Sequence, residues 1–161
     1  MKQFVKFSGL CAAVLALVTF ILQLASPAIT GANIGGWGNG NVPGTVAIFG
    51  NDTYTLSWAG LLSWIFVLVA LLGVCCITVC DLLKIKALEK FASLILFVGA
   101  GLLLVAGIFM FTVSGTFLAA NGLNNLVSAG VGAGWIIGGI LAILAAGCAA
   151  LKPVLDLLGK K

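Results

Sequence analysis

The chain has 161 residues, of which 62% are hydrophobic and only 7% are charged. About a quarter of the residues in an ordinary soluble domain are charged, so this composition excludes that class. The net charge of +4 comes from residues that fall between long apolar runs. It therefore indicates membrane topology, and we expect no nucleic-acid partner.

Four apolar runs predict four transmembrane helices, at about residues 7–30, 56–80, 91–120 and 127–151. Each run exceeds the roughly 20 residues that an α-helix needs to cross about 30 Å of hydrocarbon. The predicted fold class is an all-α integral membrane protein, with one four-transmembrane-helix bundle over residues 1–161. The lipid bilayer is its first expected partner.

The basic residues all lie before the first run, between the second and third, or after the fourth. They are Lys2, Lys6, Lys84, Lys86, Lys90, Lys152, Lys160 and Lys161. Because lysines are enriched in cytoplasmic segments, both termini and the inner loop 81–90 are predicted to be cytoplasmic. The predicted location is the cell membrane, as a multi-pass protein. Asp52 is the only charged residue on the predicted outer side.

The N-terminus has a second interpretation. Met1–Lys6, the apolar run and Ser26-Pro27-Ala28 together resemble a secretory signal with a cleavage site. We favour a retained helix, because the run is longer than the about 7–15 apolar residues of a signal core. Cleavage would leave three helices. In either case Pro27 predicts a kink or a helix end.

The outer loop 31–55 changes character halfway. Its first half is rich in glycine and asparagine, whereas Thr45–Phe49 and Thr53–Leu56 are β-prone and flank Gly50-Asn51-Asp52. We predict a small extracellular β-hairpin with its turn at Asn51. Asn51 also begins an Asn-Asp-Thr glycosylation sequon, although turn chemistry alone accounts for the same residues.

Aromatic side chains in and beside this nearly uncharged loop form a candidate contact surface. They are Trp37, Phe49, Tyr54 and Trp58. Such a surface offers apolar contact without repulsion between like charges. It suits association between copies in one membrane or in two facing membranes.

The fourth run carries a small residue at every fourth position: Gly130, Gly134, Gly138, Ala142, Ala146 and Ala150. Such a row lets a second helix approach closely, which in lipid replaces the missing hydrophobic drive. The row serves either packing within one bundle or contact between subunits. The second possibility predicts a homo-oligomer. Beyond the row, Pro153 is expected to end the helix.

The cysteines lie near the predicted inner helix ends. Cys75, Cys76 and Cys80 are either small apolar packing residues or lipidation sites. The chain has no histidine and no charged partner near these thiols. We therefore expect no metal and no cofactor.

None of the four predicted helices contains an acid or a lysine, which argues against ion-coupled transport and against catalysis. We expect a non-enzymatic, structural or self-assembling subunit. One alternative is an oligomeric pore lined by polar residues: Gln23, Ser93, Thr112, Ser114 and Thr116. In that case Gln23 would line a path, whereas we expect it to form an interhelical hydrogen bond. Another alternative is an accessory subunit bound to a different membrane protein.

The layout resembles that of claudin-type tetraspan proteins, with inner termini, a larger first outer loop and a small second one. The resemblance covers topology only. The claudin loop signature of Trp, Gly-Leu-Trp and two cysteines is absent apart from Trp37. What the resemblance implies is contact through the outer loop.

Overall fold

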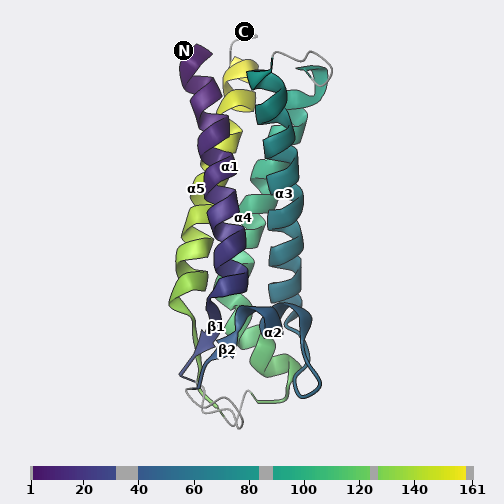
Figure 1. Ribbon diagram of the computed structural model, residues 1–161, viewed down its shortest axis with the longest axis vertical. Coiled ribbons are helices and arrows are strands. Elements are labelled where there is room, and N and C mark those ends of the chain that lie inside the picture. The colour runs from purple at the N-terminus through teal and green to yellow at the C-terminus, as the bar shows by residue number, and fades with distance from the viewer. Residues whose placement is uncertain (1, 32–39, 84–88, 124–126, 159–161) are drawn as a thin grey trace.

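The computed structural model describes residues 2–31, 40–83, 89–123 and 127–158. Four long helices lie side by side along its length (Figure 1): α1 (Lys2–Ala25), α3 (Trp58–Leu82), α4 (Glu89–Ala120) and α5 (Ala133–Leu158). A short helix and three short strands gather at one end: α2 (Gly44–Phe49), β1 (Pro27–Thr30), β2 (Val42–Pro43) and β3 (Gly130–Val131). We call this the sheet end. Both termini lie at the opposite end, which we call the lysine end.

The prediction of four helices is confirmed, since all four are long and apolar enough to cross a membrane. They form a closed ring in the order α1, α3, α4, α5, in which each helix packs against two neighbours. The core towards the lysine end consists mostly of alanines, such as Ala12, Ala70 and Ala106. Small side chains let the helix backbones approach closely, which is how apolar helices pack in lipid.

The core at the sheet end contains larger side chains. Ile29, Ile48, Phe117 and Trp135 are all fully buried there. These residues come from a strand, from α2 and from two long helices. The segments that connect the long helices at the sheet end therefore have a hydrophobic core of their own, shared with the helix ends.

The first helix is shorter than predicted, because it ends at Ala25 and not at residue 30. The Ser26 backbone N–H and hydroxyl both donate to the Leu22 carbonyl, at 3.1 and 2.5 Å. Pro27 has no N–H to continue the helical ladder, and it begins strand β1 instead. The expected helix end at this proline is confirmed.

The predicted β-hairpin over residues 45–56 is wrong. Residues 44–49 form the helix α2, which ends at Gly50 with a φ of 71°. Ala47 and Ile48 are fully buried, so tertiary packing overrides the β-propensity of this segment. Gly44 is required at the start of α2, since a Cβ there would lie 2.0 Å from the Gln23 carbonyl oxygen.

The sheet that does form has the strand order β2-β1-β3, with both pairings antiparallel. Ile29 in the central strand is paired with Val42 on one side and Val131 on the other. The fourth long helix therefore begins at Ala133, and the predicted start at residue 127 is wrong. Gly130 belongs to strand β3 and not to a helix.

The fourth long helix also extends further than predicted. It continues through Pro153 to Leu158, so the expected helix end at this proline is wrong. Pro153 is buried inside the helix. Packing against neighbouring helices can compensate for the backbone carbonyl that a proline leaves without a hydrogen bond. As a result α5 reaches the lysine end with Lys152 and Asp156 inside it.

Candidate functional site

The row of small residues on α5 packs first against the chain itself. A Cβ at Gly134 would lie 2.2 Å from the Ser26 hydroxyl oxygen, and one at Gly138 would lie 2.6 Å from the Met110 methyl carbon. Ala142 is completely buried, while Gly130 stands apart in β3. This half of the row joins α5 to its neighbours in the same bundle, and its role between subunits stays a prediction.

The other half of the row borders a groove on the outside of the bundle, although Ala146 is itself buried and Ala150 half-buried. Ala146 and Ala150 help to line a groove between α4 and α5 of about 460 Å³, together with Phe97, Ala100, Gly101, Leu104, Ile143 and Gly147. A Cβ added at Gly101 or Gly147 would meet no atom within 4 Å. We call this the α4–α5 groove. It has an apolar lining and space for another close-packed chain.

The predicted aromatic contact residues pack against different neighbours, and their role in contact between copies stays a prediction. Phe49 is 53% exposed and packs edge-on to Trp64, whereas Trp58 is 52% exposed and packs edge-on to Phe109 of α4. Tyr54 lies 5.9 Å from the Phe117 ring, between ring centroids. Trp37 lies outside the described residues.

Asn51 forms the predicted turn without the predicted hairpin. Its side-chain oxygen accepts hydrogen bonds from the backbone N–H groups of Thr53 and Tyr54, at 3.1 and 2.7 Å. This is the Asx-turn geometry that the residue favours. Asn51 is exposed, and its glycosylation stays a prediction.

All five cysteines are free thiols in the structure. Cys76 is exposed, while Cys75 and Cys80 are half-buried. Cys76 and Cys80 lie one turn apart on the same face of α3. Their lipidation stays a prediction. Among the described residues, no three His, Cys, Asp or Glu side chains gather where they could hold a metal ion.

Gln23 forms the expected interhelical hydrogen bond. Its amide nitrogen donates to the Ser63 hydroxyl at 3.1 Å, and that hydroxyl donates to the Gly60 carbonyl at 2.9 Å. Both side chains are fully buried. Nearby, Thr19 donates to the Gly138 carbonyl at 3.3 Å. Polar side chains thus connect α1 to both of its neighbours near the sheet end.

Three other residues of the predicted pore lining, Thr116, Thr112 and Ser93, form hydrogen bonds within the chain. Thr116 and Ser57 share a hydrogen bond of 2.6 Å between their hydroxyl groups. Thr112 donates to the Phe109 carbonyl of its own helix. Ser93 donates to the Asp156 carboxylate. Thr116 and Ser93 therefore connect α4 to other parts of the bundle, whereas Thr112 bonds within its own helix. A pore between several copies stays a prediction.

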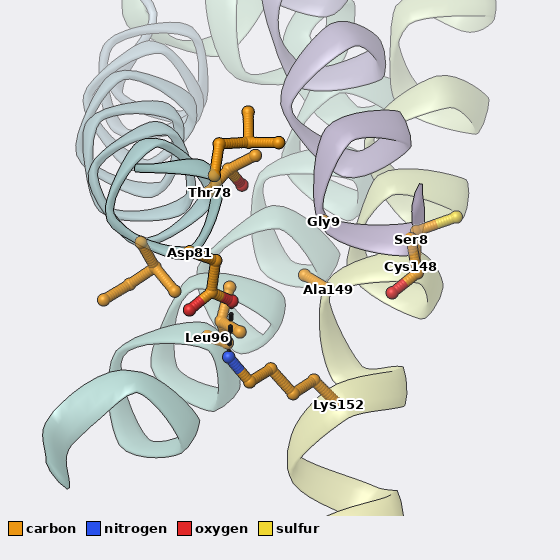
Figure 2. A pocket seen from close by; sticks show the side chains of 10 residues that line it. Ser8, Gly9, Thr78, Asp81, Leu96, Cys148, Ala149 and Lys152 are labelled. Carbon is orange, nitrogen blue, oxygen red and sulfur yellow. Dashed lines mark hydrogen bonds and ion pairs between the residues drawn. The ribbon is translucent and has the colours of Figure 1, made fainter. Parts of the chain in front are cut away.

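A charged cluster at the lysine end was missed by the sequence analysis. Lys152 of α5 and Asp81 of α3 form an ion pair, with 2.5 Å between Nζ and Oδ2. The pair lies beside a small pocket of about 20 Å³, which Ser8, Thr78 and Cys148 also line (Figure 2). The volume is enough for about one water molecule. It is too small for an organic ligand.

Both residues of this pair are visible in the sequence, one residue beyond the predicted ends of the second and fourth helices. The predicted helices ended at residues 80 and 151, so Asp81 and Lys152 were assigned to loops. In the structure both residues lie inside helices. Four residues after Lys152, Asp156 accepts the hydrogen bond from Ser93 of α4. The last two turns of α5 are therefore tied to α3 and to α4 by side chains.

Comparison with protein-family models, with curated proteins and with solved structures found no match to this chain.

Proposed function

We propose that this chain is a non-enzymatic tetraspan membrane protein with a structural role. Copies of it associate side by side in one bilayer through the α4–α5 groove. The lysine end faces the cytoplasm, because lysines are enriched in cytoplasmic segments. The sheet end, with Asp52 as its single charge, faces outward and carries the aromatic contact residues.

The observation that supports this proposal best is the shape of the α4–α5 groove. Its floor is formed by small residues from both helices, and the space over Gly101 and Gly147 is open. In lipid, close backbone approach at small residues drives helix association through van der Waals packing. A third helix packed here would gain contacts that the monomer leaves unmade.

A second copy suits the groove because the same surface also carries a projecting side chain. Phe97 borders the groove and is 57% exposed. Under two-fold symmetry, the same patch of each subunit contacts its counterpart. The Phe97 ring of each copy would then fill the groove of the other. Such an exchange of rings would make the surface complementary to itself.

Substitution of the open glycines tests the interface without changing the core. Gly147→Leu and Gly101→Leu should fill the groove, since a Cβ at either position would meet no neighbouring atom and the longer side chain can extend into the open space. The matched control is Gly115→Leu, also on α4 with open space around it, about 21 Å further along the helix at 1.5 Å per residue. Native mass spectrometry measures the mass of each assembly for protein in lipid nanodiscs, over a range of protein-to-lipid ratios.

We expect the wild-type chain and Gly115→Leu to form an oligomer, and the two groove variants to shift to monomer. A wild-type chain that stays monomeric at every ratio would exclude self-assembly. If the chain instead copurifies in a fixed ratio with another membrane protein, the accessory-subunit alternative replaces the proposal. An oligomer that Gly147→Leu leaves unchanged would move the interface away from the groove.

A further inference from the structure

Charge in this protein is concentrated at the lysine end. α1 begins there, α3 ends there, α4 begins there and α5 ends there. The chain segments at these four positions carry all eight lysines and three of the four acids, which leaves a surplus of five positive charges. By sequence, this surplus lies at or next to the four helix ends. Such a density of charge creates a strong local field.

One of these lysines is already paired. Lys152 is held by Asp81, and their side chains are only 21% and 34% exposed. Figure 2 shows the Lys152 side chain of α5 directed towards the carboxylate of Asp81 on α3, across the ring of helices. A lysine held in this way contributes little positive charge to the surroundings. The ion pair therefore reduces the positive charge that the lysine end presents to surrounding molecules.

The same end also exposes apolar side chains. Leu82 and Leu83 at the end of α3, and Leu157 and Leu158 at the end of α5, are largely exposed to solvent. A nucleic acid or an acidic peptide would neutralise the lysines but would leave these leucines uncovered. The surface of an anionic bilayer can pair with the lysines and also cover the leucines, since it offers phosphate groups beside acyl chains.

We propose that the lysine end binds the headgroups of anionic phospholipids, and that Asp81 restrains this binding by holding Lys152. Each lysine near an anionic membrane surface strengthens the attraction by about fivefold in affinity. Asp81 competes with the lipid phosphate for the Lys152 ammonium group. The inference requires the four helices to lie in a bilayer, but it does not require self-association, so the two proposals fail separately.

The test compares two substitutions that change the net charge equally. Asp81→Asn at the lysine end and Asp52→Asn at the sheet end each remove one negative charge. The protein is held in mixed micelles with equal amounts of phosphatidylglycerol and phosphatidylcholine, and native mass spectrometry measures which lipid stays bound. We expect Asp81→Asn to raise the preference for phosphatidylglycerol by about fivefold, and Asp52→Asn to leave it unchanged.

Lysine substitutions provide a second measurement that does not depend on Asp81→Asn folding. Lys152→Gln should change the preference by less than twofold, because that lysine is already neutralised. The double variant Lys2→Gln/Lys6→Gln should lower it by tenfold or more. Equal retention of both lipids by the wild-type chain would overturn the proposal. An equal gain from Asp81→Asn and Asp52→Asn would overturn the role of Asp81.

Discussion

The two ends of the bundle are held together in different ways. At the sheet end, three strands, a short helix and the helix ends are joined by backbone hydrogen bonds, such as Gly44 N–H to the Ser26 carbonyl at 3.1 Å and Gly132 N–H to the Ala28 carbonyl at 2.8 Å. Large side chains are buried beneath them. At the lysine end, the described contacts between helices include an ion pair and a hydrogen bond, both involving partly exposed side chains.

This difference indicates where the stability of the fold is concentrated. Close backbone contacts at the sheet end leave no room for a side chain at particular glycines. Ion pairs near the surface contribute little, because water and salt screen them and long side chains lose entropy. We therefore expect substitutions at the sheet end to affect folding, and substitutions at the lysine end mainly to affect the surface charge.

The largest effect is expected for Gly132→Ala at the sheet end. The new Cβ would lie 1.9 Å from the Pro27 carbonyl oxygen, so β1 and the start of α5 would have to move apart. We expect a loss of about 3 kcal/mol in the free energy of unfolding, measured by SDS-induced unfolding in mixed micelles. Gly130→Ala is the control, since its Cβ would come no closer than 4.0 Å to a neighbouring atom, the Thr30 carbonyl oxygen. Equal losses from both variants would contradict this account.

A smaller effect is expected in the polar contact between α1 and α3. Ser63→Ala would remove the acceptor for the buried Gln23 amide, and we expect a loss of about 1 kcal/mol in the free energy of unfolding. The double variant Gln23→Met/Ser63→Ala should lose less than Ser63→Ala alone, because no buried amide is then left without a partner. Additive losses in the double variant would show that the hydrogen bond is not the cause.

The smallest effect on stability is expected at the lysine end. Lys152→Gln should lower the free energy of unfolding by no more than about 1 kcal/mol, since the ion pair is partly exposed. A double-mutant cycle with Asp81→Asn measures the coupling between the two residues. A coupling energy above that of Gln23 and Ser63 would reverse the comparison between the two ends.

Sequence reasoning located the four long helices because hydropathy reports directly on segments of about 20 apolar residues. It placed α4 almost correctly, at 91–120 against Glu89–Ala120. It failed where apolar segments are not helical. Residues 27–30 and 127–132 continue the apolar runs in composition, yet they form strands and connections because Pro27 and Gly132 bring two segments into backbone contact.

The candidate site was predicted only in part. Ala146 and Ala150 were identified from their spacing, and they line the α4–α5 groove. Gly147 lies on the same helix next to Ala146 but falls outside the four-residue spacing of the row. Gly101 lies on α4, and a row on one helix does not show which residues of a second helix face it. The Asp81–Lys152 pair was missed for a similar reason. Its two residues are far apart in the chain, on α3 and α5, which face each other across the ring of helices. Helix prediction alone does not show that the ends of these two helices meet.

The strand order at the sheet end has a consequence for how the protein is made. The central strand β1 follows the first long helix, but one of its partners, β3, immediately precedes the last one. During synthesis β1 therefore waits with one edge unpaired until nearly the whole chain has emerged. An unpaired strand edge can pair with other chains. We therefore expect pairing of β1 with other chains, if it occurs, between insertion of the first and of the fourth long helix.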